Sequence, residues 1–223
     1  MAVRAALGFK LHTGWAMAVA VAGHPNEIQV LFRGRVELLP PDESVPRFVY
    51  HEAAELPLSR ATALVSRARE AAQKTARVAI RSILRELDAR GAKAGVCGIP
   101  SGSTVVPDDL SGILRSHALI HTAEGALFQQ AIVLACESRG LTVTATRERE
   151  VWSRAAGAWG LPEAGLRKEV DALRKSLGAP WSADHKTAAA LALLALGTHP
   201  SIPDTKASAT SSYAARPGPA SRA

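Results

Sequence analysis

The stretch that most constrains the fold is Ala5–Gly23, whose main part reads LGFKLHTGWAMAVAVAG. Apolar residues lie on both sides of a polar segment, Lys10–Gly14, and this pattern predicts a strand that breaks there and resumes through Ala16–Val21. Lys10, His12 and Thr13 therefore come at the tip of a hairpin whose arms are apolar enough to be buried. Charged or titratable side chains beside a buried strand are unusual, so we expect this tip to carry chemistry.

The rest of the chain divides into alternating strands and helices. Ile28–Leu39 alternates as a third strand, and the prolines after it predict a loop over Leu39–Leu56. A long helix follows from Pro57 and Ser59 to Arg90, with Gly91 just past its end. The remaining predicted elements are a strand at Ala92–Ile99, a helix from Asp108 to Gly140, a strand at Leu141–Thr146, and helices at Glu148–Trp159, Pro162–Leu177 and Ser182–Leu196.

Length and composition predict one α/β domain over residues 1–200, followed by a disordered Ser/Ala/Pro-rich tail over 201–223. Cys97 and Cys136 lie in no CxxC spacing, which indicates two small buried hydrophobes in a reducing compartment. The apolar runs are too short for a signal-peptide core or a membrane span, so we expect a cytoplasmic protein with no membrane association.

The net charge of +7 fits an anionic partner such as nucleic acid, phosphate or nucleotide, although surface charge also serves solubility. One face of the long helix is strongly basic, and this face is either a phosphate-facing surface or simply a solvated one. No P-loop, GxGxxG, GxSxG or paired-cysteine zinc pattern occurs, which removes the main support for the common nucleotide-binding, acyl-transfer and zinc-finger classes.

Three meandering strands followed by helix, strand, helix, strand and helices resemble the ribonuclease H-like fold. Two short segments are similar to RuvC-type resolvases within that fold: Leu7–Lys10 with Thr13–Ala16, and the alanine-rich segment Asp184–Leu196. The resemblance implies a mixed sheet of three antiparallel strands and then alternating helix and strand, with extra C-terminal helices. It would also imply divalent metal held by carboxylates at the first strand, after the fourth strand and on the last helix.

This sequence departs from that carboxylate pattern. Lys10 stands at the first-strand position, the loop after Ile99 offers Ser101, Ser103 and Thr104 but no acid before Asp108, and Thr187 stands three residues after Asp184. An ammonium repels a cation that needs oxygen ligands. We therefore expect no two-metal nuclease chemistry.

Polar side chains still converge at that edge of the sheet if the fold is right. We expect them to bind a phosphate-bearing ligand or nucleic acid through ammonium, imidazole and hydroxyl donors. The alternative is structural: Lys10 reaches the surface and Asp184 only stabilises the first turn of its helix. The residues of this predicted ligand site are Lys10, His12, Thr13, His51, Ser101, Asp184, His185 and Lys186.

His117, His121 and Glu124 form a second candidate site, because their spacing puts them on one helical face. Two imidazoles and a carboxylate suit acid–base catalysis or a metal ion, or they make ordinary hydrogen bonds to loops. His51, in the Pro-bounded loop, could reach either candidate site.

Three functions follow. The first is nucleic acid or phosphate binding without cleavage. The second is a hydrolase or phosphotransferase that uses His117, His121 and Glu124, with or without a metal. The third is a scaffold for another protein that uses the amphipathic C-terminal helices, and exposed apolar area on Ser182–Leu196 would favour it. The cofactor and the oligomeric state do not follow from the sequence.

Overall fold

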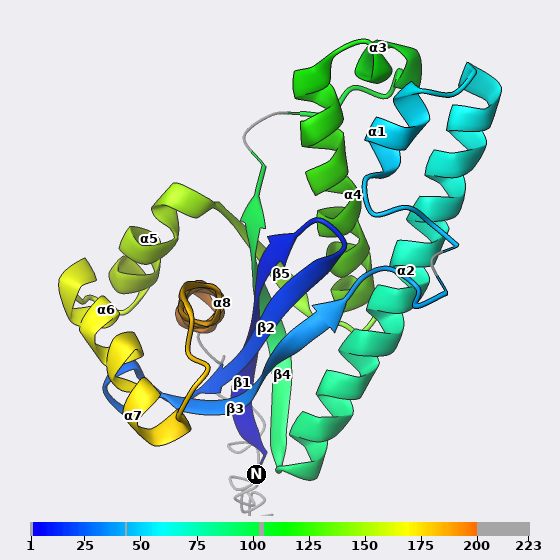
Figure 1. Ribbon diagram of the computed structural model, residues 1–223. Coiled ribbons are helices and arrows are strands. Elements are labelled where there is room, and N and C mark those ends of the chain that lie inside the picture. The colour runs from blue at the N-terminus through cyan, green and yellow to red at the C-terminus, as the bar shows by residue number, and fades with distance from the viewer. Residues whose placement is uncertain (1, 43, 103–104, 200–223) are drawn as a thin grey trace, which may run out of the picture.

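The computed structural model describes residues 2–42, 44–102 and 105–199. Ser103, Thr104 and the predicted tail at 201–223 therefore lie outside the described residues. A five-stranded sheet with the order β3-β2-β1-β4-β5 forms the centre (Figure 1). Its strands are β1 (Val3–His12), β2 (Trp15–Ala22), β3 (Gln29–Glu37), β4 (Ala92–Ser101) and β5 (Thr142–Arg147).

The sheet is mixed, as predicted. β1–β2 and β2–β3 pair antiparallel, whereas β1–β4 and β4–β5 pair parallel. The hairpin turn is tighter than expected, because β1 continues through His12 and Gly14 takes the positive φ of 81° that the turn needs. Since β1, β4 and β5 run in one direction, their carboxyl ends share one edge of the sheet, which we call the carboxyl edge.

One face of the sheet carries α2 (Leu58–Ala89) and α4 (His117–Glu137), with α1 (Val49–Ala54) and α3 (Leu110–Leu114) beyond them (Figure 1). The predicted loop over Leu39–Leu56 was wrong in part, because α1 forms there with Val49, Tyr50 and Ala53 buried. The predicted helix from Asp108 to Gly140 is two helices. Asp109 accepts hydrogen bonds from backbone N–H groups at the start of α3, and Ser116 does so at the start of α4.

The other face carries α8 (Ala183–Thr198), packed on β1, β2 and β4, with α5 (Val151–Ala158), α6 (Glu163–Ala172) and α7 (Arg174–Leu177) around it (Figure 1). Two short 3-10 turns, Pro25–Glu27 and Glu148–Glu150, complete the elements. α8 approaches the sheet closely because Gly8 and Gly98 face it: a Cβ on Gly98 would lie 2.1 Å from the Leu191 carbonyl oxygen. Ala188–Leu196 is buried throughout, so this segment does not offer the exposed apolar area that would favour the scaffold hypothesis.

Cys97 and Cys136 are both buried, as predicted, and the neighbouring Cys97 thiol together with burial raises the pKa of Cys136. α4 is long and apolar enough, by length and composition alone, to cross a membrane, and half of its most apolar window is buried inside the protein. The absence of membrane association and the cytoplasmic location stay predictions.

Candidate functional site

Lys10 ends the buried part of β1 at the carboxyl edge, and it pairs with Glu148, which directly follows β5 on the far side of β4. The Lys10 Nζ donates to both Glu148 carboxylate oxygens at 2.7 Å. The Lys10 side chain is 17% exposed and that of Glu148 is 56% exposed. The parallel pairing of β1, β4 and β5 creates this pair, because it brings the end of β5 to the same edge.

His12 lies two residues further along β1 and contacts the start of α8. Its Nε2 is 3.0 Å from Asp184 Oδ2, and its ring stacks on Trp15 with the centroids 4.1 Å apart. The Arg35 guanidinium also lies over the Trp15 ring, 4.2 Å from its centroid. His12 and Asp184 are therefore in contact. Asp184, the acid that matches the resolvase pattern, is here the partner of an imidazole.

His185 and Lys186 turn away from this edge. His185 is buried and forms a capping box at the start of α8, with its Nδ1 accepting from the Ser182 backbone N–H at 3.2 Å. Burial, helped by the positive charge of Arg33, lowers the pKa of His185. Lys186 pairs with Asp171 of α6 at 2.9 Å. The predicted ligand site is therefore split between two places.

These contacts do not fit the two-metal site of the resolvase pattern. Lys10 occupies the first-strand position and holds the Glu148 carboxylate, while Asp184 is engaged by His12. In the part of the chain that the structure describes, three potential metal ligands gather in one place, and that place is not this edge.

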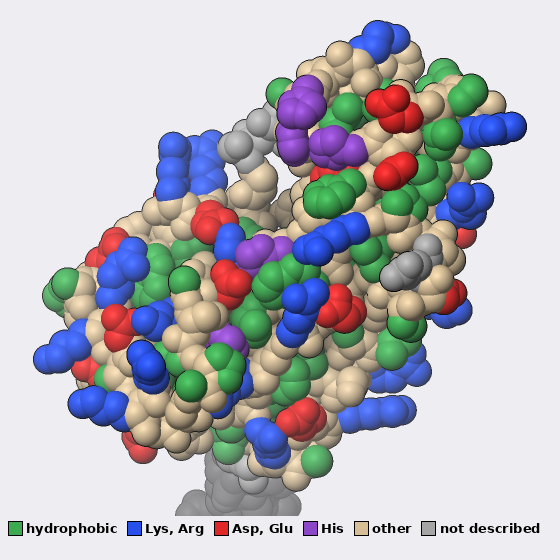
Figure 2. Space-filling view, in the orientation of Figure 1, with side chains coloured by type: hydrophobic (Ala, Val, Ile, Leu, Met, Phe, Trp, Pro, Cys, Tyr) green, Lys and Arg blue, Asp and Glu red, His purple; other side chains and the backbone are tan. Residues whose placement is uncertain are grey.

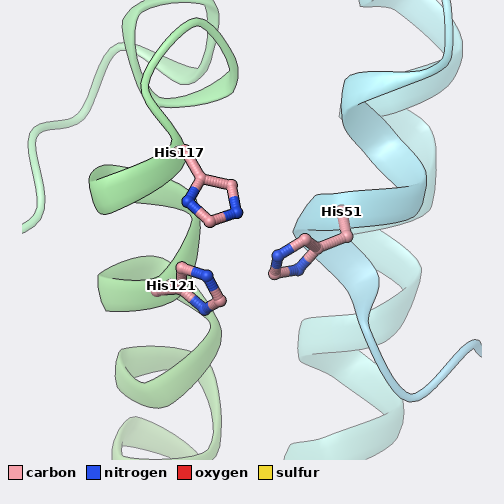
Figure 3. A group of neighbouring side chains, drawn as sticks. All are labelled: His51, His117 and His121. Atoms are coloured by element: carbon pink, nitrogen blue, oxygen red, sulfur yellow. The ribbon is translucent and has the colours of Figure 1, made fainter.

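That place is on the helices above the carboxyl edge. His117 and His121 project from one face of α4, and His51 of α1 projects toward them from the opposite side (Figure 3). One nitrogen from each ring lies within 4.8 Å of the other two. His117 and His121 are exposed, and His51 is half-buried. We call these three residues the His cluster.

Glu124, the third member of the candidate site on α4, is more buried than the two histidines. It is 3% exposed and lies beneath the cluster. Its Oε1 accepts from the backbone N–H of Tyr50 at 2.7 Å and of His51 at 3.3 Å, and lies 3.3 Å from His51 Nδ1. Glu124 therefore fixes α1 and the His51 ring, and His51 takes the third place beside His117 and His121.

Two cavities connect the cluster with the carboxyl edge. A cavity of about 210 Å³ is lined by residues of both regions, among them His12, Thr13, His51, His121 and Glu124. A wider one of about 570 Å³ runs from Ser101 and Gly102 to His121 and Gln129. The two regions therefore share walls, with His121 in both cavities.

Sequence reasoning missed two partners. Glu148 was assigned only to a helix start, although its position just after a predicted parallel strand pointed to the carboxyl edge. His51 was left without a location because a Pro-bounded loop gives no periodicity from which to place it.

Comparisons with known proteins find similarity in structure alone. No protein-family model matches the sequence, and no curated sequence matches it. The structure is similar to that of Thermus thermophilus RuvC in complex with Holliday junction substrate, with 14% identity and a TM-score of 0.50 over 85% of this chain and 91% of that chain.

Two further solved structures are similar at lower scores. Another T. thermophilus RuvC structure has 14% identity and a TM-score of 0.44 over 85% of this chain and 92% of that one. The yeast mitochondrial Holliday junction resolvase Ydc2 has 12% identity and a TM-score of 0.41 over 86% of this chain and 76% of that one. The strand order, the helices on both faces and the likeness to the first of the three show that this chain has a ribonuclease H-like fold of the RuvC type.

Proposed function

We propose that this protein binds nucleic acid, or another polymer that bears phosphates, and does not cleave it by two-metal chemistry. The observation that carries the proposal is a basic stripe on α2. Arg60, Arg67, Lys74 and Arg81 recur every seven residues, which is about two helical turns. Arg77 and Arg85 flank them.

All six side chains of this basic stripe are exposed. Among the described residues, none of the six has an ion-pair partner within 4.0 Å, whereas Arg90 of the same helix pairs with Glu86. From Arg60 to Arg85 the stripe extends about 37 Å at 1.5 Å per residue. Lys and Arg side chains project along the right-hand rim of the molecule in Figure 2, where α2 lies. An extended row of unpaired charges suits a polyanion better than a single phosphate group.

The likeness to RuvC supports the same proposal, because that protein is in complex with a Holliday junction substrate. The absence of two-metal cleavage is supported by the ion pairs at the carboxyl edge. Lys10 places a cation where a metal ligand would have to be, and Glu148 is held by it. Cleavage by two metal ions needs both ions in place to activate water and stabilise the leaving oxygen.

Fluorescence anisotropy with labelled single- and double-stranded DNA, measured over a salt series, tests the binding. We expect affinity to fall steeply with salt, because each phosphate contact releases about one counterion. The triple variant Arg67→Ala/Lys74→Ala/Arg81→Ala should reduce the slope of log K against log salt by about 3. The control variant Arg139→Ala/Arg149→Ala/Arg174→Ala removes the same charge elsewhere and should leave the slope nearly unchanged.

Binding that is indifferent to salt, or equal losses in the two triple variants, would contradict the nucleic-acid proposal. The absence of two-metal cleavage is tested separately. The same DNA substrates and a four-way junction are incubated with Mg²⁺ or Mn²⁺ and examined for cleavage. Cleavage that requires the metal and disappears in Asp184→Asn would overturn the statement that two-metal chemistry is absent.

A second candidate function is hydrolysis or phosphoryl transfer at His117, His121 and Glu124. The shared cavity favours it, because His121 and Glu124 line one space with His12 and Thr13. In this arrangement the imidazoles would do the acid–base work and Glu124 would orient His51. A panel of phosphate mono- and diesters tests it: we expect His121→Ala to abolish turnover with unchanged thermal stability, and no turnover by the wild-type protein would exclude it for these substrates.

A further inference from the structure

We propose that His51, His117 and His121 form a mononuclear site for a divalent transition metal of the zinc class, and that Glu124 is its positioning residue. The inference does not depend on nucleic-acid binding, because the basic stripe on α2 contributes no ligand to the site.

The geometry of the three rings carries the first step. His117 and His121 are four residues apart on α4, so both rings project from the same helical face, and their centroids lie 4.4 Å apart. The His51 ring approaches from α1, with its centroid 4.8 Å from that of His121 and 5.9 Å from that of His117. The rings point toward a common space (Figure 3).

The spacing of the nitrogens is close to that of a filled site. Tetrahedral zinc with Zn–N bonds of about 2.0 Å sets its ligand nitrogens about 3.3 Å apart. The candidate nitrogens here lie within 4.8 Å of one another. Small rotations of the exposed His117 and His121 side chains would close the remaining difference, and His51 is already fixed.

Glu124 supplies the second, independent observation. It is 3% exposed, and its Oε2 has no hydrogen-bond partner among the described residues. A buried carboxylate is costly unless positive charge lies close to it. The described part of the chain places no lysine or arginine within ion-pair distance of Glu124, and His51 is its one ionisable partner there.

This arrangement is the one that metal-bound histidines use. A carboxylate that accepts from one ring nitrogen fixes the tautomer and orients the other nitrogen toward the ion. Here Glu124 Oε1 lies 3.3 Å from His51 Nδ1, which leaves His51 Nε2 for the metal. A bound dication would supply, through His51, the positive charge that the buried carboxylate lacks.

The ligand set determines the class of metal. Three imidazoles suit zinc, copper, nickel or iron, whereas Mg²⁺ and Ca²⁺ prefer oxygen ligands. Three protein ligands also leave one tetrahedral position open, which is the pattern of catalytic and not of closed structural zinc sites. His51 and His121 line the 210 Å³ cavity, so a small ligand or water in that cavity can reach the ion.

The test is a titration of the full chain, stripped with chelator, with Zn²⁺ in competition with a chromophoric chelator, and with Co²⁺ as a spectroscopic probe. We expect one ion per chain and the visible absorption of tetrahedral Co²⁺. His117→Ala and His121→Ala should each weaken binding by more than about 100-fold, because each removes one of three ligands. Both residues are exposed, so these variants keep the fold.

Glu124→Gln separates positioning from ligation. It should weaken binding by about 10- to 100-fold while stoichiometry stays at one ion. His24→Ala is the matched control, because His24 is exposed and lies against Trp159, outside the cluster. Circular dichroism of every variant checks the fold. Absence of stoichiometric binding, or equal affinity in the wild type, His121→Ala and His24→Ala, would overturn the proposal.

Discussion

The carboxyl edge and the His cluster lie side by side but differ in how their polar groups are paired. At the carboxyl edge Lys10 is paired with the Glu148 carboxylate, and the His12 ring contacts the Asp184 carboxylate. The His cluster gathers three similar groups around one buried acid that is only partly satisfied. Figure 2 shows histidine side chains exposed together over α1 and α4. Paired side chains such as those of the carboxyl edge are typical of a structural surface. Several potential ligands gathered around an incompletely paired buried acid are typical of a binding site.

The two regions also depend on different supports. The carboxyl edge is built on the contact between the sheet and α8, which Gly8 and Gly98 permit. The His cluster depends on the contact between α1 and α4, which Glu124 holds from below. Substitutions at these supports should therefore affect one region more than the other.

The largest effect should come from Gly98→Ala. Its Cβ would lie 2.1 Å from the Leu191 carbonyl oxygen, and neither backbone can yield without separating α8 from the sheet. We expect a loss of at least about 3 kcal/mol in the free energy of unfolding, measured by chemical denaturation. Gly95→Ala in the same strand is the control, because a Cβ there meets nothing within 4 Å. Equal stability of the two variants would contradict the close packing of α8.

Glu124→Ala should have the next largest effect, confined to the His cluster. The change leaves the buried N–H of Tyr50 and the N–H of His51 without their acceptor, which should cost about 2–4 kcal/mol. Glu124→Gln keeps an acceptor oxygen and should cost less. Denaturation in the presence of chelator measures both without any contribution from metal. A Glu124→Ala protein as stable as the wild type would show that α1 is held in another way.

Lys10→Met tests the carboxyl edge. The ion pair with Glu148 is partly solvated, since the acid is 56% exposed, and such pairs contribute at most about 1 kcal/mol. The methionine keeps the apolar contacts of the lysine stem, so we expect a change in unfolding free energy below about 1 kcal/mol. A loss as large as that of Glu124→Ala would mean that the two regions do not differ as described.

The smallest effect concerns the pH dependence of stability through His185. Its pKa is lowered in the folded protein, by burial first and by Arg33 second, while Asp184 acts in the opposite direction. Above its ordinary value of 6.5 the ring is neutral in both states and its contribution is complete. As the pH falls below about 6.5 the unfolded chain takes up the proton first, so stability decreases until the lowered pKa is passed.

His185→Gln provides the comparison for that effect. Glutamine can still accept from the Ser182 N–H in the capping box but does not titrate. The Tm measured by thermal unfolding should therefore fall less between pH 8 and pH 5 in His185→Gln than in the wild type. Parallel curves for the two proteins would assign the acid sensitivity to other groups.

Much of the fold could be predicted because it depends on local patterns. The hairpin, the long helix over Leu58–Ala89 and the order of strands and helices follow from alternation, periodicity and turn residues. Errors occurred where tertiary burial overrides local signals: α1 forms in a proline-bounded segment because Val49, Tyr50 and Ala53 are buried against neighbouring helices.

The sequence by itself determined which groups are available at the sites: a lysine at the end of the first strand, two histidines four residues apart, and an acid at the start of the last helix. Only the tertiary structure decided their partners. Parallel pairing joins Lys10 to Glu148 across 138 positions of sequence, and the packing of α1 on α4 brings His51 to His117 and His121. Partners so far apart in sequence are chosen by the packing of whole elements, and no local pattern carries that information.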